Sequence, residues 1–120
     1  MVTDVKEKEI QETLIKELKD YRALKVKLEN LKERREAGVI DPFPSLLNSD
    51  ILDELKVKQI ERGLKESLDP IERGIIELKY LNHREINDIE IFMSLGLKKG
   101  KYYAKKNEAI RRLSKALGII

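Results

Sequence analysis

The chain contains no cysteine, and aromatic residues make up only 5% of its 120 positions. Without cysteine it forms neither disulfide bonds nor thiolate metal sites, an absence that fits a reducing cytoplasm. With so few aromatic rings, its hydrophobic core must be small and aliphatic. No apolar run approaches the roughly 20 residues that span a membrane, and Met1-Val2-Thr3-Asp4 does not resemble the start of a signal peptide. We therefore expect a cytoplasmic protein with no membrane partner.

Common active-site patterns are missing as well. The sequence has no glycine-rich phosphate loop, no serine or cysteine nucleophile near a histidine, and no paired carboxylates set among apolar residues. Its one histidine, His83, has no second histidine or cysteine with which to share a metal ion. We expect a protein that is not an enzyme and that needs no metal ion or cofactor.

Charge is plentiful but unevenly distributed: 39% of the residues are charged, and the formal net charge is +3. Residues 96–120 contain eight lysines and arginines and one glutamate, a net charge of +7, whereas the other 95 residues carry −4. A concentrated positive segment is typical of a surface that binds a nucleic-acid backbone. The alternative is a solvated helix face. Residues 4–37 are just as charged but mix the two signs, so the segregation favours nucleic-acid binding.

The pattern of apolar residues predicts an all-α fold, since no segment alternates apolar and polar residues over the length of a strand. Residues 4–37 lack proline and glycine and predict a helix about 50 Å long, ended by a left-handed Gly38. Its later apolar residues have a heptad-like spacing: Tyr21, Leu24, Leu28 and Leu31. The long charged segment 1–38 is therefore expected to serve oligomerisation or partner binding. It either pairs with a second copy as a homodimer, which we favour, or folds back on its own domain.

Residues 39–49 predict a linker, because Pro42 and Pro44 prevent a helix. Asn48 and Ser49 provide an N-cap for the helix that follows. Three apolar side chains are expected to anchor the linker against the carboxy-terminal domain, with a partner-binding peptide as the alternative: Phe43, Leu46 and Leu47.

The remainder of the chain, residues 50–120, is expected to form a small helical domain. Asp69 should cap one of its helices, with Pro70 in the first turn. The pattern predicts four helices, at about 50–67, 70–82, 85–94 and 99–117. The residues expected to face the core are apolar: Leu52, Leu55, Ile60, Leu64, Ile71, Ile75, Ile76, Leu78, Leu81, Ile86, Ile89, Phe92 and Met93.

The last two predicted helices are joined by Leu95-Gly96-Leu97, and the second of them is strongly basic. Two short helices joined by a glycine-containing turn are typical of a helix-turn-helix, which places its second helix in the major groove of DNA. Residues at about 85–117 therefore predict a motif that binds double-stranded DNA.

Twelve residues of this domain recur at a characteristic spacing: Leu64, Leu68, Asp69, Glu72, Arg73, Ile76, Tyr80, Ile91, Leu95, Gly96, Ala109 and Leu113. In this spacing the chain resembles region 4 of the sigma-70 family, whose helix-turn-helix recognises the promoter −35 element. Further matches are Tyr102-Tyr103, Lys106, Glu108-Ala109, Ala116-Leu117-Gly118-Ile119 and the amino-terminal Tyr21-Arg22-Ala23-Leu24-Lys25. In these the chain resembles the ArpU-type phage transcriptional regulators. The resemblance implies a phage or prophage regulator in the cytoplasm of a bacterial host cell.

Three positions depart from the sigma-like pattern. Phe92 stands where the family has a small residue between the two helices, and should widen or rotate their crossing. Lys98 replaces the serine that usually caps the recognition helix, and its ammonium cannot accept a backbone hydrogen bond. Glu108 replaces the usual arginine before the alanine. These departures bear on base specificity more than on the fold. The 120 residues also hold no counterpart of the regions that open promoter DNA.

The recognition helix should expose its first turn and one face to the DNA. Lys98, Lys99 and Lys101 are expected to contact phosphate, with a guanine edge within reach of one of them. Asn107 has the amide geometry that pairs with adenine, the alternative being a solvent-exposed side chain without that role. Tyr103 is expected to contact a phosphate or a base methyl group.

Other residues around this helix have smaller expected roles. Gly100 and Ala104 are small and should let the helix approach DNA closely, and Arg84 should contact phosphate from the start of the preceding helix. The remaining cations cannot all reach one duplex, and among them we favour Lys105 over Arg111 and Arg112.

Three more residues are predicted to be structural. Tyr102 lies on the buried side of the recognition helix. Glu72 suits the first turn of its helix because of the helix dipole, and Arg73 can tie two helices together.

Three functions are compatible with these features. The first is a sequence-specific transcription regulator that reads promoter or operator DNA. The second is an interaction module that binds RNA polymerase or another regulator. The third is a DNA-packaging or architectural protein that joins a helix-turn-helix to an oligomerising helix.

Overall fold

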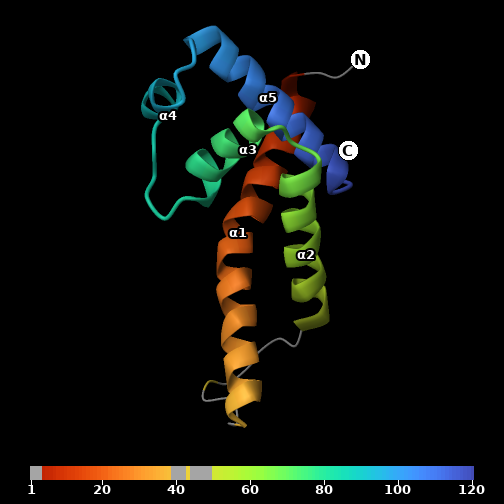
Figure 1. Ribbon diagram of the computed structural model, residues 1–120. Coiled ribbons are helices and arrows are strands. Elements are labelled where there is room, and N and C mark those ends of the chain that lie inside the picture. Colours follow the sequence, from red (N-terminus) through yellow and green to blue (C-terminus); the bar gives the residue numbers. More distant parts are fainter. Residues whose placement is uncertain (1–3, 39–42, 44–49) are drawn as a thin grey trace.

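The computed structural model describes residues 4–38, 43 and 50–120, which form helices and connecting turns with no strand among them. The elements are α1 (Asp4–Ala37), α2 (Asp50–Glu66), α3 (Pro70–Ile76), η1 (Glu77–Leu81), α4 (Asp88–Ser94) and α5 (Lys99–Ala116). α2 lies beside α1, while α3, α4 and α5 gather toward one end (Figure 1). The all-α prediction is confirmed. None of the helices in these described segments has the length and apolarity needed to cross a membrane.

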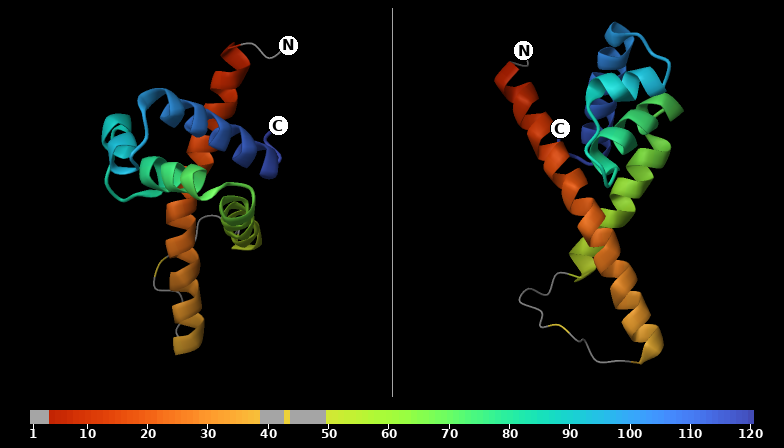
Figure 2. Two further views of the ribbon diagram at one scale, coloured as in Figure 1. Left: turned by 45° about the horizontal axis from the view of Figure 1, so that its top comes forward. Right: turned by 90° about the vertical axis from the view of Figure 1, so that its left-hand side faces the viewer.

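The long helix α1 packs on the rest of the chain through its middle part, and its two ends extend beyond the other helices in the right-hand view of Figure 2. Leu14 and Leu18 are completely buried, and Tyr21 is nearly so. They share one core cluster with residues of α2, α3 and α5: Val57, Ile60, Leu64, Ile76, Ala109, Ile110 and Leu113. Burial of each leucine contributes roughly 1.5–3 kcal/mol. Of the two arrangements that the sequence left open, the helix is folded back, and Tyr21, Leu24 and Leu28 of its apolar seam pack on the core of the same chain.

In α2 the predicted core residues Ile60 and Leu64 are buried, but the first part of the helix turns a different face inward than predicted. Leu52 and Leu55, expected to face inward, are 55% and 48% exposed. Val57 is buried instead. Asp53, one turn earlier on the same side, accepts a hydrogen bond from Lys27 of α1 at 2.6 Å. The contact with α1 therefore decides the rotation of α2, and the prediction for Leu52 and Leu55 is wrong.

The start of α3 follows the predicted capping pattern, with Pro70 in its first turn. The Asp69 carboxylate accepts a hydrogen bond from the Glu72 N–H at 2.7 Å, and the Glu72 carboxylate accepts one from the Asp69 N–H at 2.9 Å. Arg73 ties α3 to the end of α2 by donating to the carbonyl oxygens of Leu64 and Lys65 at 2.8 and 2.7 Å. The structural roles predicted for Glu72 and Arg73 are confirmed.

The predicted single helix over 70–82 is α-helical only through Ile76 and continues as the π-helical turn η1. α4 begins at Asp88, later than predicted, because the Asn87 side chain caps it by accepting a hydrogen bond from the Glu90 N–H at 2.8 Å.

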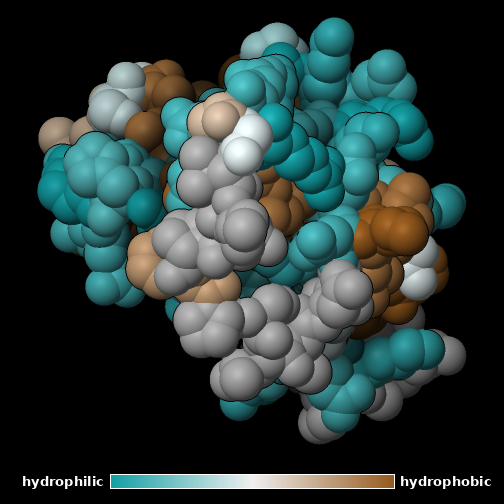
Figure 3. Space-filling view, turned by 90° about the horizontal axis from the view of Figure 1, so that it is seen from below, coloured by the Kyte–Doolittle hydropathy of each residue, from teal (hydrophilic) through white to brown (hydrophobic). Residues whose placement is uncertain are grey.

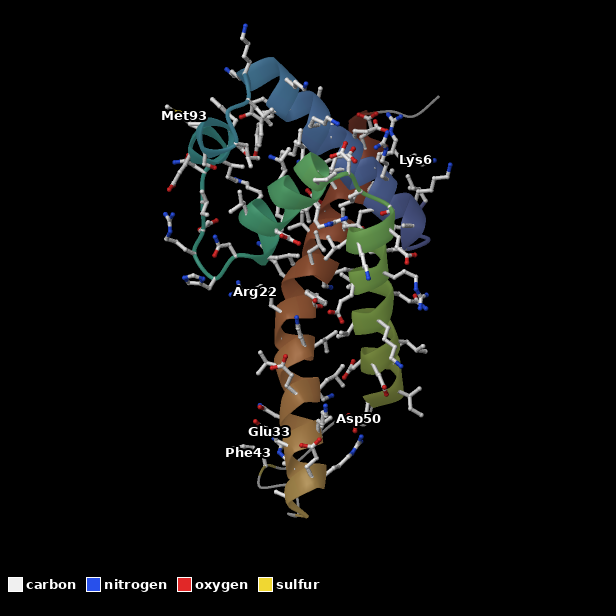
Figure 4. All side chains as sticks on the ribbon, viewed as in Figure 1. Lys6, Arg22, Glu33, Phe43, Asp50 and Met93 are labelled. Atoms are coloured by element: carbon white, nitrogen blue, oxygen red, sulfur yellow. The ribbon has the colours of Figure 1, made fainter. Side chains whose placement is uncertain are left out.

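Four more residues expected in the core or against the carboxy-terminal domain lie on the surface. On α4, Ile89 and Met93 are 60% and 71% exposed, and Met93 points away from the body of the protein (Figure 4). Ile71 is exposed at the start of α3 because the inward side of that helix is taken by Ile75 and Ile76. Phe43 is largely exposed, with the Arg34 guanidinium of α1 5.7 Å from its ring centroid. Leu46, Leu47 and the expected cap at Asn48 and Ser49 lie outside the described residues.

Candidate nucleic-acid interface

α4 and α5 are joined by a tight turn at one end of the molecule, in a helix-turn-helix arrangement (Figure 1). Gly96 adopts φ +66°, a left-handed conformation that favours glycine. The Gly96 N–H donates to the Met93 carbonyl at 3.2 Å, and the Leu97 N–H donates to the Phe92 carbonyl at 2.9 Å. This pair of hydrogen bonds is the Schellman motif, which closes the end of a helix. The turn thereby fixes the direction in which α5 leaves α4.

The bulky Phe92, where the sigma-like pattern has a small residue, is accommodated by an aromatic contact. Its ring centroid lies 5.5 Å from that of Tyr102. Tyr102 is completely buried, as predicted.

The outward side of α5 carries five exposed residues at helical spacing: Gly100, Ala104, Asn107, Arg111 and Lys115. We call this strip the outer face. Its first two members are small, and a Cβ added at Gly100 would meet nothing within 4 Å. Another backbone can therefore approach the first turns of α5 closely, and Asn107 and Arg111 follow on the next turns. The outer face includes three predicted contacts, namely Gly100, Ala104 and Asn107.

The amino-terminal end of α5 is positive and open. Lys98 occupies the N-cap position, and within the described residues no side-chain hydrogen bond caps the helix there. Lys98, Lys99 and Lys101 are all exposed. Uncapped backbone N–H groups and a helix dipole favour an anion at such an end. The predicted phosphate contacts are thus brought together beside the outer face.

Tyr103 lies at the edge of the core beneath this end of α5. Its half-buried ring is edge-on to that of Tyr102, with centroids 5.1 Å apart, and the Lys106 ammonium is 5.7 Å from its centroid. The side chain therefore has a packing role in addition to the DNA contact predicted for it.

The side of α5 that faces α3 carries two basic residues, Lys105 and Arg112, that form ion pairs with Asp69 and Glu72. We call these two ion pairs the brace. The Lys105 ammonium donates to the Asp69 carboxylate at 2.6 Å. Arg112 donates to both carboxylate oxygens of Glu72, at 2.9 and 3.0 Å, and Glu72 is completely buried. The hydrogen bond from the Glu72 N–H, followed by that from Lys105, lowers the pKa of Asp69. The charge of Glu72 is the main cause that raises the pKa of Arg112.

The brace changes the expectation for Lys105. A phosphate that bound this ammonium would compete with Asp69, which also caps α3. Arg111, ranked below Lys105 from the sequence, is instead exposed on the outer face. The spacing of Arg111 from Ala104 and Asn107 in the sequence was the signal that could have placed it on this exposed face.

A polar cluster fastens α4 to α5 behind the interface. Asp88 accepts hydrogen bonds from the Tyr102 hydroxyl at 2.6 Å and from Lys106 at 3.0 Å, and Lys79 of η1 lies 3.6 Å away. Burial acts to raise the pKa of Asp88, but these bonds and charges outweigh it, and the pKa lies below its usual value. Burial, followed by the bond to Asp88, raises the pKa of Tyr102. The cluster therefore holds Asp88 ionised and the Tyr102 hydroxyl protonated as its donor.

Arg84 lies in the turn before α4, apart from α5. Its guanidinium is exposed and pairs with Glu90 at 2.9 Å, which raises the pKa of Arg84. To contact a phosphate, the Arg84 guanidinium would have to release Glu90.

The first turns of α1 border the far side of the interface. A groove of about 530 Å³ lies between Glu7 and Ile10 of α1 and Asn107 and Arg111 of α5. The outer face is therefore bordered by α1 from Asn107 onward.

The described residues contain no group of three or more histidine, cysteine, aspartate or glutamate side chains placed to hold a metal ion. His83 is exposed in the turn before α4.

Comparison of the chain with known protein families, with curated proteins and with solved structures finds no match.

Proposed function

We propose that this protein is a sequence-specific DNA-binding transcription regulator whose α5 reads promoter or operator DNA. The observation that carries the proposal is the outer face of α5, where two small residues precede Asn107 and Arg111 beside an uncapped, lysine-rich helix start. Amide and guanidinium groups form bidentate contacts with adenine and guanine, and lysines at a helix start suit phosphate.

The sigma-like resemblance supports the same reading. It adds the proposal that the regulator serves phage or prophage genes in the cytoplasm of a bacterial cell. It also favours a non-enzymatic protein that works without a cofactor. The residues proposed to contact DNA are Lys98, Lys99, Gly100, Lys101, Tyr103, Ala104, Asn107 and Arg111, with Arg84 at the edge and Lys105 contributing only if it leaves Asp69.

A second candidate is an interaction module that binds RNA polymerase or another regulator. Ile89 and Met93, one turn apart on α4, favour it because both are largely exposed. Exposed apolar side chains next to a helix-turn-helix provide a contact for a protein partner. Both activities can coexist in one regulator, since these side chains lie on α4 and not on the outer face of α5.

The proposal is tested by binding to random duplex DNA and to promoter fragments over a salt series. We expect one preferred fragment and a steep loss of affinity with salt. Replacing Lys99 and Lys101 together by alanine should weaken binding about tenfold at low salt. It should also reduce the slope of log K against log[salt] by about 2, or 0.9 for each phosphate contact.

The matched control replaces Lys16 and Lys19, two exposed lysines of α1, by alanine. The same charge is removed, so an equal loss of affinity in the control would contradict a localised interface. Salt-sensitive binding without a preferred fragment would favour the DNA-packaging or architectural alternative. No binding at low salt would refute the DNA proposal and leave a polymerase partner as the function to test.

A further inference from the structure

The first turns of α1 place an acidic side chain beside the residues proposed to read DNA. Glu7, Ile10 and Leu14 follow one another at intervals of three and four, so they share one face of the helix. Leu14 is completely buried and belongs to the same core cluster as Ile110 of α5. This packing holds that face of α1 toward α5, and Glu7 lines the groove of about 530 Å³ between the two helices.

The groove brings together one acidic and one basic side chain. Among the described residues that line it, Glu7 is the only acid and Arg111 the only base. Both are exposed, and neither forms an ion pair with another described residue. Both charges therefore act on whatever enters the groove. The end of the molecule away from α5 differs, because hydrophobic patches interrupt its hydrophilic surface when it is seen from below (Figure 3).

We propose that Glu7 is a specificity-determining residue of the DNA interface, which disfavours a phosphate at Arg111 and leaves that guanidinium for a base edge. This inference rests on the function proposed for α5. A phosphate bound to Arg111 would bring a full negative charge into the groove, where the Glu7 carboxylate repels it. The N7 and O6 atoms of guanine also accept hydrogen bonds from arginine, but the base carries no net charge and is opposed much less. Glu7 thus discriminates by repulsion between two partners that Arg111 alone would accept.

The phosphate contacts proposed at the other end of α5 lie beyond the influence of Glu7. Lys99 precedes Arg111 by twelve residues, which is about 18 Å along a helix that rises about 1.5 Å per residue. That separation exceeds the screening length of about 8 Å at physiological ionic strength. Glu7 therefore acts on Arg111 without weakening the lysines at the helix start.

The expected effect is that of two exposed like charges. Such an interaction changes affinity by roughly two- to fivefold at low salt and is screened as the salt concentration rises. Binding to random DNA depends on phosphate contacts, whereas binding to a preferred site also depends on base contacts. Glu7 should therefore lower affinity for random DNA more than affinity for the preferred fragment, and so raise the ratio between them.

The test compares the full chain with its Glu7→Gln variant, by fluorescence anisotropy on random duplex DNA and on the preferred fragment over a salt series. Glu7→Gln should bind random DNA about threefold more tightly at low salt, with a smaller gain on the preferred fragment. On random DNA the slope of log K against log[salt] should steepen by up to about 0.9, the value of one added phosphate contact. The matched control is Glu9→Gln, which removes the same charge from an exposed residue of α1 outside the groove lining and should change neither affinity.

A second substitution tests whether the effect depends on Arg111. In a chain that carries Arg111→Ala, adding Glu7→Gln should change the affinity for random DNA little, because the cation that would hold the phosphate is missing. Equal effects of Glu7→Gln and Glu9→Gln would overturn the proposal. So would equal gains on random and preferred DNA, or an effect of Glu7→Gln that persists in full beside Arg111→Ala.

The outcomes also separate this inference from the function on which it rests. An unaltered chain that binds a preferred fragment, together with a Glu7→Gln variant whose affinity for random DNA is unchanged, would overturn the role of Glu7 alone. An unaltered chain that binds no DNA at low salt would refute both.

Discussion

Both long sides of α5 carry lysine or arginine, but these basic residues have different surroundings on the two sides. On the brace side, Lys105 and Arg112 pair with Asp69 and Glu72 of the neighbouring helix region. On the outer face and at the helix start, Lys99, Lys101 and Arg111 are exposed, and in the described part of the chain no carboxylate lies within ion-pair distance of them. A basic residue is thus available to an external phosphate only where the fold has not already supplied an anion. Net charge alone does not distinguish the two sides.

The largest expected effect comes from removing the buried anion of the brace. Glu72→Ala should lower the free energy of unfolding by about 2–3 kcal/mol, because it removes a capping-box bond, leaves the Asp69 N–H without its acceptor and takes the buried partner from Arg112. Urea denaturation measures the change. Glu108→Ala, which removes the more exposed partner of Arg112, should cost under about 1 kcal/mol. If the two variants were equally stable, the brace would not support the fold.

The next largest effect is on DNA affinity, which should depend on the outer face of α5 more than on the brace. Arg111→Ala should weaken binding about three- to tenfold with little change in stability, as expected for an exposed contact. Lys105→Ala should leave affinity within about twofold, since its ammonium is already paired with Asp69, and should slightly lower stability. Fluorescence anisotropy on one duplex at constant salt compares them. The reverse ranking would show that Lys105 leaves Asp69 to bind DNA and would restore the ranking made from the sequence.

The smallest effect concerns acid stability. The pKa of Asp69 is lowered in the folded chain by the Glu72 N–H and by Lys105. The ionised carboxylate therefore stabilises the fold above the unfolded-state pKa of about 4, and this contribution is lost as the pH falls through the folded-state pKa. Asp69→Asn keeps a capping side chain but cannot titrate.

Unfolding measured between about pH 5 and pH 2 should therefore show a smaller loss of stability in Asp69→Asn than in the unaltered chain. Asp88 also has a lowered pKa but is present in both proteins, so it cancels in the comparison. Identical pH dependence in the two proteins would contradict the role of Asp69.

The sequence predicted the features that depend on local backbone chemistry. Asp69 and Pro70 mark the start of α3, and Gly38 adopts positive φ at the end of α1, as predicted. These positions could be identified because capping and left-handed glycine act within a few residues.

Features that depend on distant neighbours were not predictable in the same way. Apolar residues occur on two sides of α2, and the contacts with α1, including the bond from Lys27 to Asp53, accompany the inward orientation of Val57 in place of Leu55. Likewise, Lys105 and Arg111 are both basic residues of α5, and the difference between them is set by Asp69, which lies 36 positions away from Lys105. Periodicity along one helix does not contain that information.

The shared core of α1 and α5 also governs the order in which the chain can be completed during synthesis. Leu14 and Leu18 belong to the same buried cluster as Ala109 and Leu113, so the surface that α1 packs against is incomplete until α5 has left the ribosome. Proteins whose segments meet early in the chain can settle as they emerge. Here about a hundred residues must be synthesised after Leu14 before it can pack against Leu113. The helix proposed to read DNA is therefore also a helix that the core around Leu14 and Leu18 needs in order to close.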